Sequence, residues 1–282
     1  ESQSVLHLFE PADVGELVAA GLLTQSTIRH RAALGPVEDI PFFKSQTRLT
    51  FARCGIIDPA SLADYKVHGG YKGLAKALAV TPAQVVEEVT ESGLRGRGGA
   101  GFPTGIKWKT VHDTAAGQKY IVCNADEGDS GTFADRMIME GDPFLLVEGM
   151  TIAGIAVGAT KGYIYVRSEY PHAIAALNTA IAAARKDGYL GRSVAGSKYS
   201  FDLEVRMGAG AYVCGEETAL LDSLEGKRGV VRAKPPLPAH KGLFGKPTVI
   251  NNVLSLVAVP FIMSEGAQAY YDYGMGRSRG TM

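Results

Sequence analysis

The sequence predicts an α/β fold built on a mostly parallel sheet, and three observations lead to that expectation. Segments rich in β-branched residues alternate with helical segments over roughly residues 80–230, the order typical of parallel sheets. Glycine accounts for 35 of the 282 residues, and many of these glycines lie where one segment passes into the next. The longest mostly apolar run, residues 144–159, contains a glutamate and is shorter than the ~20 residues that a membrane-spanning helix requires. We therefore expect a globular α/β protein without direct membrane insertion.

The clearest helix start lies at Thr81, after a helical pattern over residues 59–78. Thr81 can cap the helix, and Gln84 is placed to complete a capping box. Gly93 marks its end. Downstream, the hydrophobic pattern predicts strands over 119–124, 162–167 and 201–207 and helices over 144–159, 171–186, 219–224 and 253–259.

Three segments are expected along the chain. Residues 1–57 lack sustained periodicity and form a lead segment, residues 58–258 form the main domain, and residues 259–282 begin a following domain whose remainder is absent. Glu1 is not methionine, and the first residues have neither the basic nor the apolar region of an export signal. A cytoplasmic protein, present here as a fragment, is therefore expected.

Composition excludes several classes of function. The 29 basic and 29 acidic residues cancel, so no overall field attracts nucleic acid. Cys54, Cys123 and Cys214 are far apart in the sequence, and no CxxC or Cys/His spacing occurs. We therefore expect no nucleic-acid partner and no metal or iron–sulfur site within residues 1–282.

A glycine-rich segment, Gly96–Gly101, satisfies the GxGxxG pattern of dinucleotide-binding loops. That pattern normally follows a strand, whereas here a predicted helix precedes it, so an ordinary Rossmann loop is disfavoured. The neighbouring Arg97 and Lys107 make the segment basic, and Phe102 offers a stacking face. We expect a binding loop for a dinucleotide; the alternative is a solvated turn.

Two further segments follow predicted strands, where open α/β sheets bind ligands. Residues 124–131 concentrate acceptor side chains suited to sugar or ribityl hydroxyls, although a Mg²⁺ or Ca²⁺ site is an alternative. Residues 208–218 lead from a strand through glycines into a helix N-terminus, where Glu216 and Glu217 could serve only as first-turn acids. Similarly, Asn251 and Asn252 could be a plain helix cap.

Taken together, four strings resemble the family of NADH-binding FMN flavoprotein subunits, in order and over about residues 40–282. They are Gly93–Gly105 (GLRGRGGAGFPTG), Asn124–Glu127 (NADE), Gly208–Thr218 (GAGAYVCGEET) and Pro247–Val253 (PTVINNV). The family includes the 51-kDa-type subunit of respiratory complex I, the diaphorase subunit of NAD-reducing hydrogenases and the flavoprotein subunit of NAD-dependent formate dehydrogenases. The resemblance implies a Rossmann-like domain in which FMN and NAD(H) share one cavity.

The resemblance also implies hydride transfer between NAD(H) and FMN, with electrons passed singly to iron–sulfur and catalytic subunits of a larger complex. A 4Fe-4S cluster is expected from the C-terminal part of the family, beyond residue 282. Phe102 would stack on NADH, Lys107 would reach its polar part, and Glu217 would tune or position the reactants without acting as a general base. The residues implied in cofactor binding are Gly96, Arg97, Gly98, Gly99, Ala100, Gly101, Phe102, Lys107, Asn124, Asp126, Glu127, Asp129, Tyr212, Gly215, Glu216, Glu217, Val249, Ile250, Asn251 and Asn252.

The chain departs from the complex I members at three positions. Thr110 and Leu237 stand where those relatives often carry an aromatic residue, and Asp129 stands where they carry a glutamate. The variant over residues 126–131 resembles the soluble hydrogenase and formate dehydrogenase members more closely, so a formate dehydrogenase flavoprotein is expected first. A hydrogenase diaphorase subunit and a complex I subunit are the alternatives. A flavin-free assembly subunit, or a Rossmann-type dehydrogenase with its own substrate site, would belong to other classes.

Overall fold

The computed structural model describes residues 4–6, 16, 19, 33–36, 39–275 and 278–279, and the chain divides into two compact units, Glu1–Leu49 and Thr50–Met282. The domain boundaries expected at residues 57 and 258 stay a prediction. In the first unit two short strands pair antiparallel ahead of a single-turn helix, and a second antiparallel pair lies near the end of the chain. These elements are β1 (Ser4–Leu6), β2 (Ala33–Pro36), α2 (Pro41–Lys44), β7 (Gly274–Met275) and β8 (Ser278–Arg279).

The second unit is built on a four-stranded parallel sheet with the order β5-β4-β3-β6. Its strands are β3 (Tyr120–Ala125), β4 (Lys161–Val166), β5 (Asp202–Met207) and β6 (Thr248–Asn252). The predicted α/β class with a parallel sheet is therefore confirmed, as are the first three strands to within a residue or two. Strand β6 was not predicted, because it is short and ends in two polar asparagines that the sequence pattern assigns to a helix cap.

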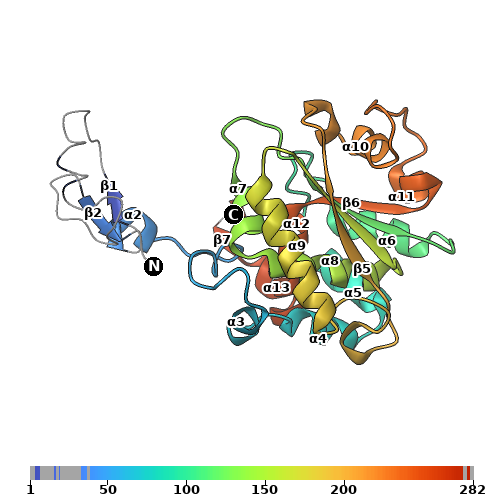
Figure 1. Cartoon of the computed structure of the whole chain (residues 1–282). Coiled ribbons are helices and arrows are strands. Elements are labelled where there is room, and N and C mark those ends of the chain that lie inside the picture. Colours follow the sequence, from blue (N-terminus) through green and yellow to red (C-terminus); the bar gives the residue numbers. More distant parts are fainter. Residues whose placement is uncertain are drawn as a thin grey trace. The chain divides into compact units, whose positions relative to one another are not determined.

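Helices cover both faces of this sheet. On β4, a side chain at Gly162 would meet Met150 of α8 (Pro143–Val157), whereas Tyr165 packs with Leu220 and Leu221 of α10 (Glu217–Leu224). Because successive side chains of a strand point to opposite faces, α8 and α10 lie on opposite sides of the sheet. Helix α9 (Pro171–Lys186) packs along β5, and Figure 1 shows it on the other side of the strands from α10.

Helix α8 is the centre of the core, and all of its residues are buried. A Cβ at Gly149 would lie only 2.2 Å from the carbonyl oxygen of Leu256, so glycine allows the close approach to the next layer. The buried Glu148 accepts hydrogen bonds from the Tyr65 hydroxyl and from the Tyr71 and Leu74 amides, which ties the preceding helices to α8. Of the described helices, none is long and apolar enough to span a membrane.

The remaining helices surround this core. Helix α5 carries the predicted capping box between Thr81 and Gln84. The predicted helix over 253–259 is instead two helices that meet at Ala258, because Pro260 cannot continue the hydrogen-bonding of the first. The bounds are α3 (Leu62–Val67), α4 (Lys72–Leu78), α5 (Pro82–Glu91), α6 (Thr104–Asp113), α7 (Ala134–Gly141), α11 (Pro238–Lys241), α12 (Val253–Val257), α13 (Val259–Glu265) and α14 (Ala267–Tyr271), with 3₁₀ turns η3 (Val194–Gly196), η4 (Tyr212–Gly215) and η5 (Leu243–Gly245).

Candidate functional site

The site lies at the carboxyl ends of β3 and β6. The chain runs from β3 to β4 on one side and later returns from β5 to β6 on the other, and such a reversal of strand order opens a crevice for ligands. Asn124 and Asn252 are register partners at this edge. The Asn124 amide donates to the carbonyl oxygen of Gly215 (2.8 Å), and Asn251 Oδ1 accepts from Trp108 Nε1 (2.9 Å). The amides are therefore fixed by the fold, and Asn252 also caps α12, as the plain interpretation of the sequence allowed.

The glycine loop, residues 93–105, connects α5 to α6 beside these strand ends. Its base is closed by hydrogen bonds from Gly96 N to Phe102 O (2.8 Å) and from Thr104 N to Leu94 O (2.9 Å). The Arg97 amide, in the middle of the loop, donates to Ser255 Oγ (2.8 Å) and so connects the loop to α12. Helices precede and follow the loop, so the GxGxxG pattern lies outside a strand–loop–helix unit, as expected from the sequence.

Two adjoining cavities open between the strand ends and these loops. The first, here called the balanced cavity, has a volume of about 520 Å³, and the second, the acidic cavity, about 660 Å³. Both volumes lie in the range of small-molecule sites. The residues that line both cavities are Gly98, Asn124, Gly215, Glu216 and Asn252.

The structure brings nearly all of the predicted site residues to these two cavities. Val249 alone among them lines neither, because its side chain points from β6 into the core and is fully buried. Besides the shared residues, Gly96, Ala100, Gly101, Phe102, Lys107, Glu217, Ile250 and Asn251 line the balanced cavity. Arg97, Gly99, Asp126, Glu127, Asp129 and Tyr212 line the acidic cavity.

The balanced cavity contains a chain of alternating charges. Lys234 Nζ lies 3.0 Å from Glu216 Oε1 and 2.8 Å from Glu217 Oε1, and Lys107 Nζ lies 3.8 Å from Glu217 Oε2. Lys107 also donates to the carbonyl oxygen of Ile250 (2.7 Å). Burial lowers the pKa of Lys107, whereas the pKa of Lys234 is raised because its hydrogen bonds to Glu217 and Glu216 outweigh the effect of burial.

Lys234 is a site residue that the sequence analysis missed. Its segment, Lys-Pro-Pro-Leu-Pro, is typical of a rigid connection, and nothing in that pattern connects Lys234 to two glutamates earlier in the chain. The one available signal was that Lys234 lies close to Leu237, a position noted because complex I relatives often carry an aromatic residue there. Leu237 and Thr110 also line the balanced cavity, and Leu237 is half exposed at its edge.

Glu216 caps a helix and also lines both cavities. Its Oε2 accepts hydrogen bonds from Thr218 N (2.8 Å) and Ala219 N (3.0 Å), so the side chain caps α10. Its other oxygen faces Lys234. Burial raises the pKa of Glu216, but these hydrogen bonds lower it more, and the carboxyl stays ionised in the cavity wall.

Besides the shared Glu216, the acidic cavity is lined by four carboxylic acids, Asp126, Glu127, Asp129 and Asp135. Glu127 lies in the left-handed region with φ of 44°, and its carboxylate accepts from the Asp135 amide (2.8 Å) and the Tyr170 hydroxyl (3.0 Å). Because the Arg136 amide also donates to Glu127 (3.1 Å), this side chain caps the start of α7.

Asp135 is a second cavity residue that the sequence analysis missed. It is 6% exposed, and burial raises its pKa to about 8, with the nearby Glu127 charge acting in the same direction. Burial also raises the pKa of Asp126. At the cavity rim, the Tyr212 hydroxyl donates to Asp129 Oδ1 (2.8 Å). In the part of the chain that the structure describes, no group of three or more His, Cys, Asp and Glu side chains is arranged to hold a metal ion.

Comparison with known proteins identifies the relatives of this fold and site. The chain is 54% identical to the NADP-reducing hydrogenase subunit HndC of Solidesulfovibrio fructosivorans, over 84% of this chain and 48% of that protein. It is 53% identical to an NADH-quinone oxidoreductase subunit of Aquifex aeolicus, over 76% of this chain and 50% of that protein. A crystal structure of an NAD⁺-reducing [NiFe]-hydrogenase in the H₂-reduced state superposes with a TM-score of 0.64 at 43% identity, over 72% of this chain and 34% of that one.

The chain thus spans about half the length of the curated relatives it matches. The family model of the Nuo51 FMN-binding domain matches residues 89–261, which include both cavities, the glycine loop and all four strands of the parallel sheet. The resemblance found in the sequence is confirmed by this match, and the chain belongs to the Nuo51 FMN-binding domain family.

Proposed function

We propose that this chain binds FMN and NAD(H) in the two adjoining cavities and forms the nucleotide-oxidising module of a larger redox complex. One observation supports this most directly. A charge-balanced cavity and an acidic cavity adjoin along a shared wall of small or amide-bearing residues and Glu216, at the switch point of a parallel sheet. Such a site suits two ligands that must meet face to face.

The residues of the shared wall fit FMN. Gly98 and Gly215 leave room for a flat ring, because a Cβ at Gly98 would already lie 3.4 Å from the Asn252 side chain. Asn124 and Asn252 offer amides to the ribityl hydroxyls. Beside this wall, the half-buried Lys107 of the balanced cavity offers a cation to a nucleotide phosphate. Bound FMN would accept a hydride and release electrons one at a time.

The remaining lining of the balanced cavity fits a pyridine nucleotide. Phe102 and Leu237 are each 50% exposed at its edge and offer apolar surface to a base. Lys234 can exchange its pairing with the two glutamates for a diphosphate, while Glu217 can accept from ribose hydroxyls. Side chains in this site orient the reactants and exclude water, and none of them is assigned as a general base.

The parent complex is a further part of the proposal. The relatives named above are subunits of hydrogenases and of NADH-quinone oxidoreductases, which favours electron transfer to iron–sulfur and catalytic subunits. The formate dehydrogenase expected first from the sequence finds no support among the relatives named here and stays a prediction. The 4Fe-4S cluster in the C-terminal part and the cytoplasmic location also stay predictions.

The single tryptophan of the chain makes FMN binding measurable without activity. Trp108 is buried and donates to Asn251, which lines the balanced cavity, so bound FMN should quench its fluorescence. We expect saturable quenching of the full-length protein by FMN, followed by bleaching of the visible flavin band on anaerobic addition of NADH. Absence of quenching would favour the flavin-free assembly subunit, and quenching without bleaching would exclude NADH as the donor.

A further inference from the structure

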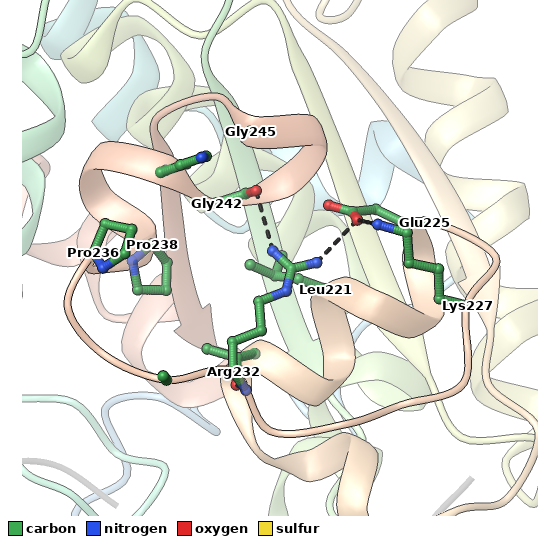
Figure 2. Close-up of a pocket in the computed structure, with 11 residues that line it drawn as sticks. Leu221, Glu225, Lys227, Arg232, Pro236, Pro238, Gly242 and Gly245 are labelled. Atoms are coloured by element: carbon green, nitrogen blue, oxygen red, sulfur yellow. Dashed lines mark hydrogen bonds and ion pairs between the residues drawn. The ribbon is translucent and has the colours of Figure 1, made fainter.

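The loop over residues 225–237 forms the wall between the balanced cavity and a third cavity of about 310 Å³. Lys234 and Leu237 face the balanced cavity, whereas Arg232, Ala233 and Pro236 face the third one. Figure 2 shows the third cavity, with Arg232 extending across it from this loop. The two sides of one short loop therefore line two different spaces.

Arg232 fastens this loop to helix α10. Its Nε donates to Asp222 Oδ1 (2.8 Å) and a terminal nitrogen lies 3.0 Å from Glu225 Oε2, with a longer contact to the Gly242 carbonyl oxygen (3.4 Å). Figure 2 draws the contacts to Glu225 and Gly242. Both carboxylates are largely buried, at 14% and 8% exposed, so the guanidinium is held in a fixed place.

The same residue is linked to the acidic pair of the balanced cavity. The Arg232 amide donates to Thr218 Oγ1 (2.8 Å), and Thr218 in turn donates its backbone amide to Glu216 Oε2 (2.8 Å). Two residues further on, Lys234 pairs with Glu216 and Glu217. The Lys234 side chain thus connects the loop to the start of α10, and the Arg232 side chain connects it to the end of α10.

The loop has few other anchors. Residues 225–237 form neither helix nor strand, and between residues 228 and 236 every hydrogen bond found among the described residues involves Arg232 or Lys234. A half-exposed lysine loses side-chain entropy on pairing, so it holds one geometry only if its backbone is already fixed. Arg232 is the residue that fixes it.

We propose that Arg232 is a positioning residue for pyridine-nucleotide binding, acting through Lys234. Its contacts with Asp222 and Glu225 hold the loop so that the Lys234 ammonium stays between Glu216 and Glu217, where a nucleotide diphosphate would meet it. The role in nucleotide binding rests on the proposed function, whereas the effect of Arg232 on Lys234 does not.

The first experiment follows Lys234 without any ligand. Lys234 in the free full-length protein is acylated with a water-soluble active ester, and the rate is measured by mass spectrometry. Pairing raises the pKa of Lys234 and slows the reaction, so R232Q should speed it by about threefold or more. An unchanged rate at Lys234 in a folded R232Q protein would overturn the proposal.

R185Q is the matched control. Arg185 also places two nitrogens on one aspartate oxygen, Asp202 Oδ1, and donates to a carbonyl oxygen, but it lies on α9, away from both cavities. R185Q should leave the acylation rate of Lys234 unchanged. If R232Q does not fold, R232K replaces it, because lysine keeps the charge but not the planar fork, and a rate above that of the wild type is expected. A wild-type rate in R232K together with unfolded R232Q would assign Arg232 to the fold alone and overturn the proposal.

The second experiment is a double-mutant cycle on the affinity for NAD⁺, measured by calorimetry on the FMN-loaded protein. R232Q and K234Q should each weaken binding by about tenfold, while R232Q added to K234Q should weaken it by less than about twofold. FMN content should stay at the wild-type level in all three variants. Fully additive effects would overturn the action through Lys234. If wild-type protein binds no NAD⁺ at all, the proposed function fails, and the acylation result still decides the link between Arg232 and Lys234.

Discussion

The balanced cavity and the acidic cavity share a wall but hold their charges in different ways. In the balanced cavity each carboxylate faces a lysine, and the pKa of Glu216 is held below its ordinary value. In the acidic cavity carboxylic acids outnumber the cation Arg97, and burial raises the pKa of Asp126 and Asp135. In the balanced cavity the fold stabilises charged carboxylates by pairing them with lysines. In the acidic cavity Asp135 is neutralised by protonation, and Glu127 is stabilised by the amides at the start of α7.

This contrast suggests how the two cavities divide their tasks. Lysines that are paired with carboxylates can exchange those partners for phosphate oxygens, so the balanced cavity suits anions. Carboxylates without cations repel phosphate and accept hydrogen bonds from hydroxyl and amide donors instead. The shared wall contains Gly98, Gly215 and two asparagines, which suits a flat polar group in contact with both cavities. Four predictions test this division, from the largest effect to the smallest.

The largest effect is expected from G98V, because Gly98 lines both cavities. A Cβ there would already contact Asn252 at 3.4 Å, and the two further carbons of valine would extend into the shared space. We expect FMN binding, followed through Trp108 fluorescence, to weaken by about a hundredfold or more. G117V is the control, since Gly117 is exposed with open space around it, and it should bind FMN as wild type does. Equal affinities in the two variants would show that the shared wall does not contact the flavin.

The second prediction tests the charge difference through the pH dependence of stability. Burial raises the pKa of Asp135 from 3.8 to about 8 in the folded protein, so the folded state binds more protons than the unfolded state between these values. Stability must therefore fall as the pH rises through this window, by up to about 1.4 kcal/mol per pH unit for one group. D135N, which cannot ionise, should remove this fall. Denaturant unfolding at several pH values measures it, and parallel curves for wild type and D135N would contradict it.

The balanced cavity should give the opposite sign. The pKa of Glu216 is lowered from 4.5, so its contribution is present above that value and is lost as the pH falls through the lower folded value. E216Q should therefore flatten the acid side of the stability curve, whereas D135N flattens the region between pH 4 and 8. The two substitutions remove stability changes of opposite sign with pH only if the pKa of Glu216 is lowered and that of Asp135 is raised in the folded protein.

The sequence was sufficient to predict most of the wall that the two cavities share. The strands at 119–124 and 201–207 and the glycines after them follow from local patterns. Asn124 could therefore be expected at the end of one strand, and Gly215 and Glu216 in the segment between the other strand and the next helix. The family resemblance, confirmed by the match over residues 89–261, supplied the roles expected of these residues, and those roles stay predictions. Local pattern is informative here because each element is long and its ends carry turn residues.

The missed residues share a physical reason. Lys234 and Asp135 are placed in the cavities by tertiary contacts with residues that are distant in sequence or in another element. Spacing within one segment of the sequence does not predict such contacts. Strand β6 was missed because only its pairing with β3, in a register that joins Tyr120 to Thr248 across a long intervening stretch of chain, defines it as a strand. Helix capping by Glu127 could not be predicted from local pattern either, because the helix it caps begins several residues later.

The third prediction concerns Glu217, which faces Lys107 and Lys234 in the balanced cavity. E217Q keeps the shape of the side chain but removes the charge that both lysines approach. We expect NADH affinity or the rate of flavin reduction in stopped-flow experiments to fall by about tenfold, with FMN still bound. E204Q, on the edge strand β5 away from the cavities, is the control. Wild-type affinity and rate in E217Q would remove Glu217 from the nucleotide site.

The smallest effect is expected from Y212F at the rim of the acidic cavity. The Tyr212 hydroxyl donates to Asp129, but the side chain is 69% exposed, so water replaces the lost hydrogen bond. We expect the unfolding temperature to change by less than about 1 °C and FMN affinity by less than about twofold. Y65F deletes the same atom in the core, where the hydroxyl donates to the buried Glu148, and should cost about 1.5–3 kcal/mol. If Y212F destabilised the protein as much as Y65F does, the rim would be part of the folded core, and the acidic cavity would be a closed chamber instead of an open one.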